Sequence, residues 1–139
     1  MLQDVGPGLA GAVVLAARAC VAESDDERRD CLARGEALLT PNALSHNHFW
    51  YRADAIDATL EAADLDETLR HAGELERYAA PEPTPWSEFV VARAHALVAA
   101  ARGAPDRQAL RALRDRGAAL QLGAALAALD AALATAPRS

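Results

Sequence analysis

The segment 46–52 holds the densest group of side chains that could bind a metal or anchor a partner: His46, His48, Phe49, Trp50, Tyr51 and Arg52. Imidazole is a common metal ligand. However, His46 and His48 are two residues apart and point away from each other on a helix, and His71 and His95 could join them only through the fold. We therefore expect capping and packing roles for the histidines and no metal site.

The aromatic residues of this segment favour a binding surface. Phe49 falls in a repeating apolar register and is expected in the core. Trp50 and Tyr51 cannot both share its helix face, so at least one of them should lie in a groove or at an interface. Large aromatic residues and Arg are favoured anchors of protein interfaces. Packing of both rings between neighbouring helices is the open alternative.

Other reactive residue types form no catalytic set. The carboxylates that most resemble an acid–base group have the spacing of an exposed helix face: Asp54, Asp57, Glu61 and Asp64. Cys20 and Cys31 match no zinc or redox spacing, and two reduced thiols are favoured, although their symmetry about the turn at 23–27 makes a disulfide conceivable. The glycines lie at helix ends rather than in a phosphate loop. The sequence predicts no enzyme, no catalytic residue and no cofactor.

Composition indicates which elements must position these residues. The 139 residues, enough for one domain, include 36 Ala and 19 Leu, whereas Val and Ile together number 8 and aromatics make up 4%. Ala and Leu are strong helix formers, and strands draw on β-branched and aromatic residues. The sequence therefore predicts an all-α domain.

Caps, glycines and prolines set the expected helix limits. Ser24 and Glu27 have the spacing of a capping box, Ser45 is expected to cap the third helix, and Pro85 suits the first turn after Thr84. Gly117 is expected to separate the last two helices. The expected helices are 9–21, 24–39, 45–62, 64–80, 85–102, 106–116 and 118–134.

A repeat of 40 residues relates these helices. Residues of similar type recur at this interval: Leu9, Phe49 and Phe89; Asp26, Asp66 and Asp106; Pro41 and Pro81. Stacked hairpins bury an apolar stripe that an isolated hairpin cannot. The pattern predicts an α-solenoid of three antiparallel helical hairpins, about 9–39, 45–80 and 86–117, followed by a C-terminal helix at about 118–134.

Several runs carry a resemblance to known families: the turn 62–67, and the segments 26–29, 34–39, 45–56, 76–78 and 83–89. The turn resembles that of the tetratricopeptide (TPR) helix pair, although the period exceeds the usual one of about 34 residues and the usual Trp, Gly and Tyr pattern is absent. Residues 22–120 are similar to the C-terminal helical-repeat region of bacterial adenylate or guanylate cyclase-type regulators with an ATPase module. The resemblance implies a sensing or protein-interaction arm, either detached or excised from a larger regulator.

Charge and hydropathy argue against a nucleic-acid-binding, a membrane-spanning and a secreted protein. A net charge of −6, with Arg as the only basic residue type apart from His, argues against a protein that binds the nucleic-acid backbone. The apolar stretch 8–17 is too short to span a bilayer. The only charged side chain before it is the acidic Asp4, whereas a signal peptide has Lys or Arg there. We expect a cytoplasmic protein with no membrane or nucleic-acid partner. Arg107, Arg111 and Arg114 share one helix face, which is either simply solvated or a docking patch for an acidic partner or for the acidic half of a second copy of the chain.

The last helix has an unusual surface. Leu122, Leu126, Leu129 and Leu133 form a heptad-like stripe, and the remaining faces are nearly all Ala. A terminal solenoid helix normally has a polar outer face. We therefore expect the stripe to mediate self-association as a homodimer; an alanine-coated cap is the alternative.

These features together predict a non-catalytic module that binds protein or peptide. The odd-numbered helices would line one surface and expose parts of six residues: Trp50, Tyr51, Asp54, Asp57, Trp86 and Arg93. The alternative is a small-molecule sensor arm with a pocket between repeats, lined by Trp50, Tyr51, Tyr78 and Trp86. A purely structural segment is a third possibility.

Overall fold

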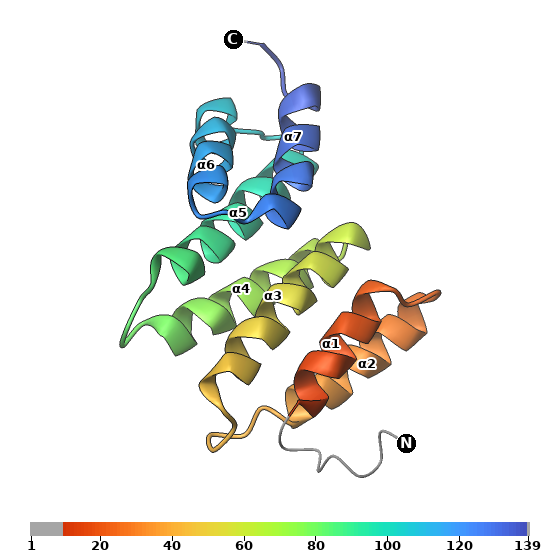
Figure 1. Ribbon diagram of the computed structural model, residues 1–139. Helices are drawn as coiled ribbons and strands as arrows, with labels where there is room; N and C mark the ends of the chain where they lie inside the picture. The colour runs from red at the N-terminus through yellow and green to blue at the C-terminus, as the bar shows by residue number, and fades with distance from the viewer. Residues whose placement is uncertain (1–9, 139) are drawn as a thin grey trace.

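The computed structural model describes residues 10–138, and every regular element in that range is a helix (Figure 1). The all-α prediction is confirmed for these residues; the expected helix start at Leu9 lies outside them. Within the described range, no helix has both the length and the apolar character needed to cross a membrane. The elements are α1 (Gly11–Cys20), α2 (Asp25–Ala37), α3 (Ser45–Glu61), α4 (Leu65–Ala79), α5 (Pro85–Ala101), α6 (Arg107–Ala119), the 3-10 helix η1 (Gly123–Ala125) and α7 (Leu126–Thr135).

Local caps start several of the helices. The Ser24 hydroxyl accepts a hydrogen bond from the Glu27 backbone N–H at 3.1 Å, as the sequence predicts. At the start of α5, Thr84 and Ser87 form a reciprocal capping box. The prediction for Ser45 is wrong: it is the first helical residue, and the N-cap is Leu44, which makes no side-chain cap.

The helices pack mainly on their neighbours in sequence. α1 lies against α2, and α3 lies against α4. The odd-numbered helices also contact one another in order, α1 with α3, α3 with α5 and α5 with α7. Side chains on these four helices can therefore contribute to one continuous surface.

Two groups of buried apolar side chains form the core. The larger group includes Ile56, Leu75 and Phe89, and draws in side chains from α3 to α7. The smaller group lies among α1, α2 and α3 and consists mostly of alanines together with Cys31, Leu32 and Tyr51. Phe49 is partly buried and packs against the larger group. Because alanine buries little area, close approach of the helices must supply much of the packing around α1.

The C-terminal part of the fold differs from the prediction. Helix α6 continues through Gly117 to Ala119, and the chain turns at Gln121, whose φ is 60°. A Cβ at Gly117 would lie 2.9 Å from both Phe89 Cζ and Leu126 Cδ2. Gly117 therefore permits α5 and α7 to approach α6 closely, and it does not end the helix.

The predicted continuous helix at 118–134 is wrong, because α7 begins only at Leu126 and Leu122 precedes η1. The four leucines nevertheless face inward. Leu129 is fully buried, and Leu122 and Leu133 pack against the larger core group. The predicted role of Leu122, Leu126, Leu129 and Leu133 in self-association is therefore wrong for the leucines, because they hold α7 onto the rest of the domain. The outward face of α7 is composed largely of alanines, including Ala127 and Ala131. The predicted homodimer would have to use that face.

Candidate interaction surface

Helices α3 and α5 bring together three residues that the sequence analysis selected. Asp57, Trp86 and Arg93 line one hollow of about 320 Å³, closed on its other side by residues 121–125. Trp86 and Arg93 lie two turns apart on α5, and the contact between α3 and α5 brings Asp57 to them. This hollow is one end of the candidate surface.

An ion pair joins the two helices at this point. Arg93 Nη1 donates to Asp57 Oδ1 at 2.7 Å, and Arg93 Nε donates to the Ala125 carbonyl oxygen at 3.0 Å. Arg93 is only 6% exposed, so the prediction that it presents itself to a partner is wrong. Its guanidinium is used to hold α3, α5 and the connection to α7 together. The Asp57 side chain remains 53% exposed.

A larger groove continues from Asp57 along α5 and α7. Its volume is about 630 Å³. Small and aliphatic side chains line most of it, and the exposed carboxylates of Asp57 and Glu61 border it. The aliphatic lining comes from three helices: Leu60 on α3; Leu97, Ala100 and Ala101 on α5; and Ala127, Ala128, Ala131 and Ala132 on α7.

The exposed edge of α3 is acidic. Asp54 and Asp57 are one helical turn apart, and Glu61 follows one turn later. Burial raises the pKa of Asp54, and the neighbouring Asp57 carboxylate raises it further. The pKa of Cys20 rises to about 11, chiefly through burial and then through Asp54, Asp57 and Glu61. Negative charge therefore accumulates along this edge despite the Asp57–Arg93 pair.

Neither cysteine is bridged. Cys20 Sγ donates a hydrogen bond to the Asp54 carbonyl oxygen at 3.4 Å, and Cys31 is buried in the smaller core group. The raised pKa of Cys20 keeps its thiol protonated near neutral pH. The conceivable disulfide between Cys20 and Cys31 is thus not formed, and Cys20 is a poor nucleophile.

Trp50 and Tyr51 lie in opposite environments. Trp50 is 59% exposed and makes an edge contact with His46, so its ring is accessible, and its expected place in a groove or at an interface stays a prediction. Tyr51 is fully buried, and its hydroxyl donates to the Leu32 carbonyl oxygen at 2.6 Å. The prediction that Tyr51 contacts a partner is therefore wrong: its ring fills the space beside Gly35, where a Cβ would lie 2.7 Å away.

The aromatic residues do not line a common pocket. Tyr78 stacks on His48 with ring centroids 4.2 Å apart, whereas Trp86 meets Phe49 edge-on at 5.9 Å. Tyr51 belongs to the core. The predicted sensor pocket lined by Trp50, Tyr51, Tyr78 and Trp86 is therefore wrong in its composition.

A polar network between α2, α3 and α4, buried at Arg52 and His71 and open to solvent at Arg70 and Glu67, was not foreseen. Arg52 Nη1 lies 3.1 Å from Glu36 Oε1 and 2.8 Å from His71 Nδ1. Arg70 makes two further hydrogen bonds to Glu36 at 2.8 and 2.9 Å, and it also bonds Glu67. Glu36, Arg52 and the α4 residues of the network are widely separated along the chain, so no local pattern could have joined them. The network joins α2, α3 and α4 to one another.

His71 is the most unusual member of this network. It is fully buried, and its Nε2 has no hydrogen-bond partner within the described residues. Burial lowers the pKa of His71 to about 4, with further lowering by Arg70 and Arg52. The pKa of Glu36 falls to about 2, chiefly because Arg70 hydrogen-bonds its carboxylate. At neutral pH the network therefore holds a neutral imidazole and an ionised Glu36.

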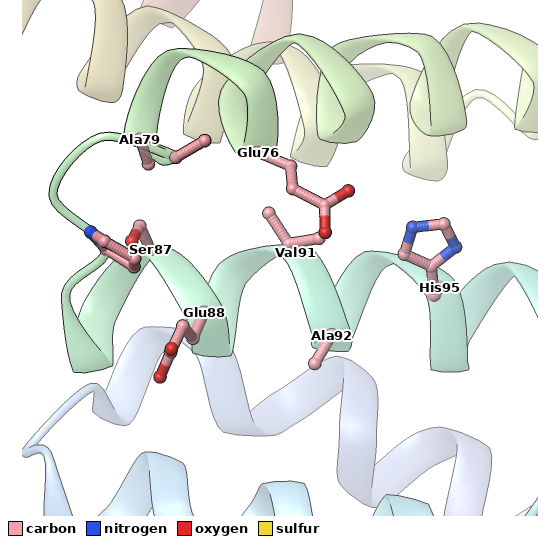
Figure 2. A pocket seen from close by; sticks show the side chains of 9 residues that line it. Glu76, Ala79, Ser87, Glu88, Val91, Ala92 and His95 are labelled. Carbon is pink, nitrogen blue, oxygen red and sulfur yellow. The ribbon is translucent and has the colours of Figure 1, made fainter.

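A second hollow of about 550 Å³ lies between α4 and α5. Figure 2 shows Glu76 and His95 extending into the gap from the two facing helices. Glu88, which borders the hollow, is bonded by Arg116 at 3.2 Å, and Ser87 is used in the cap of α5. No group of three His, Cys, Asp or Glu side chains in the described part of the chain is placed to hold a metal ion.

The basic face of α6 serves the fold. Arg107 Nη1 donates to the Leu133 and Ala136 carbonyl oxygens at the end of α7, and Arg114 Nε donates to Asp130 at 2.6 Å. Arg111 is exposed. Two of the three arginines therefore attach α7 to α6, which weakens the interpretation of this face as a docking patch.

Comparison of the chain with protein-family models, with curated proteins and with solved structures found no match. The geometry of the surface is therefore the main basis for a functional assignment. The groove formed by α3, α5 and α7, at about 630 Å³, is larger than the hollow of about 320 Å³ that it adjoins.

Proposed function

We propose that this protein is a non-catalytic helical-repeat module that binds a protein or peptide. In this interpretation the pairs α1/α2, α3/α4 and α5/α6 are three TPR-like hairpins of an α-solenoid, and α7 ends the array. The successive contacts of α1, α3, α5 and α7 support it, because they create one face to which every pair contributes.

One observation carries the proposal: the groove of about 630 Å³ bordered by α3, α5 and α7. Its lining of alanine and leucine side chains suits an amphipathic partner that inserts an apolar face. Its charged residues suit binding better than proton transfer, since Arg93 is engaged by Asp57 and by the Ala125 carbonyl.

The wider biological setting is part of the same proposal. Association with a cyclase-type bacterial signalling protein is supported by the sequence runs at 26–29, 34–39, 45–56, 76–78 and 83–89. A cytoplasmic location follows from that association. We propose no nucleic-acid or membrane partner, because the chain is acidic overall.

A small-molecule sensor is the second candidate. The hollow beneath Trp86, with a volume of about 320 Å³, is near the lower end of the usual range for ligand sites of about 300–1,000 Å³. The ion pair of Asp57 and Arg93 would offer such a ligand polar contacts. This hollow replaces the aromatic pocket expected from the sequence.

Two measurements distinguish these candidates. In the first, a library of displayed peptides is selected on the wild-type protein, and the selected peptides are tested on Ala131→Leu, which fills the groove, and on Ala112→Leu, an exposed position on α6 outside it. We expect loss of binding only for Ala131→Leu. In the second, a Trp50→Phe variant leaves Trp86 as the one indole, and its emission is followed during titration with nucleotides and metabolites. A saturable shift, with no selected peptide, would overturn the proposal in favour of the sensor.

A further inference from the structure

The groove has the dimensions of a site for one helix. Its α7 wall is a helix of ten residues, which corresponds to a length of about 15 Å or nearly three turns. Alanines on α5 and α7 leave room for larger side chains from outside, and they allow another helix to approach closely. Leucine-sized side chains of a partner at positions i, i+4 and i+7 would enter this space.

The charges around the groove are unequal. Asp57 and Glu61 border it, and Asp54 lies one turn before Asp57 on the same edge of α3. Among residues 10–138, the one cation that lines the groove is Arg93, which is buried and bonded to Asp57. Burial is the main cause of the raised pKa values of Asp54 and Cys20, and the carboxylates on this edge raise both further.

We propose that the groove binds a cationic amphipathic helix of another protein. The apolar side chains of this helix occupy the alanine-lined floor, and its Arg or Lys side chains lie opposite Asp54, Asp57 and Glu61. The inference depends on the proposed function and adds the chemistry of the partner. Complementary charge of this kind governs specificity and the rate of association more than it governs total affinity.

A second copy of the chain is a less suitable occupant. Its most basic helix is α6, with four arginines. Three of them are bonded within their own chain: Arg107 to the end of α7, Arg114 to Asp130 and Arg116 to Glu88. Only Arg111 lacks such a bond among the described residues, which leaves this helix with little free positive charge.

The test uses three designed helical peptides of about 20 residues, above the length of about 12–15 residues below which an isolated helix is marginal in water. They share one leucine stripe and carry Arg, Gln or Glu on the flanking positions. Binding to the full chain is measured by fluorescence anisotropy at low and raised salt. We expect the Arg peptide to bind about tenfold or more tightly than the Glu peptide at low salt, and the difference to shrink at raised salt.

Matched variants locate the binding site. Glu61→Lys reverses an exposed charge beside the groove, and Glu76→Lys reverses an exposed charge on α4 outside it. We expect Glu61→Lys to weaken the Arg peptide about five- to tenfold and Glu76→Lys to change it by less than about twofold. Ala131→Leu should abolish binding of the peptide, and Ala112→Leu should not. All four positions are exposed, so folding should be preserved, and circular dichroism verifies this.

Each other outcome contradicts the inference in a recognisable way. Equal or tighter binding of the Glu peptide, still lost in Ala131→Leu, would refute the cationic partner and leave the proposed function intact. Binding by none of the three peptides would refute the helical cationic partner, and the displayed library then tests the proposed function separately. Sedimentation as a dimer at tens of micromolar, converted to monomer by Ala131→Leu, would assign the groove to a second copy.

Discussion

His71 should make the stability of this protein depend strongly on pH. Arg52 donates to His71 Nδ1, so the imidazole proton lies on Nε2, and the ring is neutral and fully buried. The charged groups that face it are Arg52, Arg70, Glu36 and Glu67. A second proton would place a third cation beside two arginines in a site without water-exposed surface. The folded state therefore resists protonation.

The sign and the size of this pH dependence follow from the pKa values of His71 in the unfolded and folded chain. In the unfolded chain His71 titrates near 6.5, whereas in the folded chain its pKa is about 4. Between these values the unfolded state binds more protons, so stability is complete above about 6.5 and is lost as the pH falls toward 4. The full difference between the two pKa values corresponds to roughly 3 kcal/mol of unfolding free energy, of which roughly 2.5 kcal/mol is already lost at about pH 4.5. This is a large share of a typical stability of 5–15 kcal/mol.

Urea unfolding, followed by circular dichroism from about pH 7 to about pH 4.5, measures this loss. The lower pH limit of about 4.5 keeps the protonation of Glu36 out of the measurement. Because the pKa of Glu36 is lowered from 4.5 to about 2, the stability that this carboxylate contributes is lost only as the pH falls between those values. His71→Gln provides a side chain that is neutral throughout and can still accept from Arg52. We expect this variant to lose roughly 2 kcal/mol less than the wild type over the same range.

His48 is the necessary control, because burial also lowers its pKa. Its ring stacks on Tyr78 and is partly exposed, so His48→Gln should leave most of the acid sensitivity in place. If the wild type and His71→Gln lose the same stability between about pH 7 and about pH 4.5, the buried neutral imidazole is not the cause. The reasoning from desolvation would then be refuted.

Three further substitutions test the packing. Gly117→Ala should destabilise the protein by about 1–3 kcal/mol, because the added Cβ would lie 2.9 Å from Phe89 and Leu126. Gly73→Ala, with no atom within 4 Å of the added Cβ, should stabilise the protein by about 0.5–1 kcal/mol. Equal urea midpoints for the two variants would contradict this. Arg93→Met should cost about 1–3 kcal/mol, because Asp57 and the Ala125 carbonyl lose their donor; an unchanged melting temperature would show that the pair is dispensable. Tyr51→Phe should cost about 1 kcal/mol by removing the hydroxyl that donates to the Leu32 carbonyl oxygen, and a neutral effect in urea unfolding would argue against a contribution from that bond.

Part of the candidate surface was predictable from the helical register of α3. Asp54, Asp57 and Glu61 fall on one edge because residues three and four apart share a helix face. The grouping of Asp57 with Trp86 and Arg93 was anticipated only as membership of one broad surface. The burial of Arg93 was not anticipated, because it depends on a carbonyl 32 residues away. The same reason explains why the network of Glu36, Arg52 and His71 gave no sequence signal.

Residues close together in the chain are sufficient to account for the helices. Abundant Ala and Leu favour α-helix, and the caps at Ser24, Thr84 and Asp106 satisfy backbone groups within three residues. Contacts between distant segments account for what each helix face does. They bury Tyr51 while Trp50 stays exposed, turn the leucines of α7 inward, and make Gly117 a point of close approach. The physical reason is that propensity and capping are local, whereas burial and the formation of a groove depend on which helices meet.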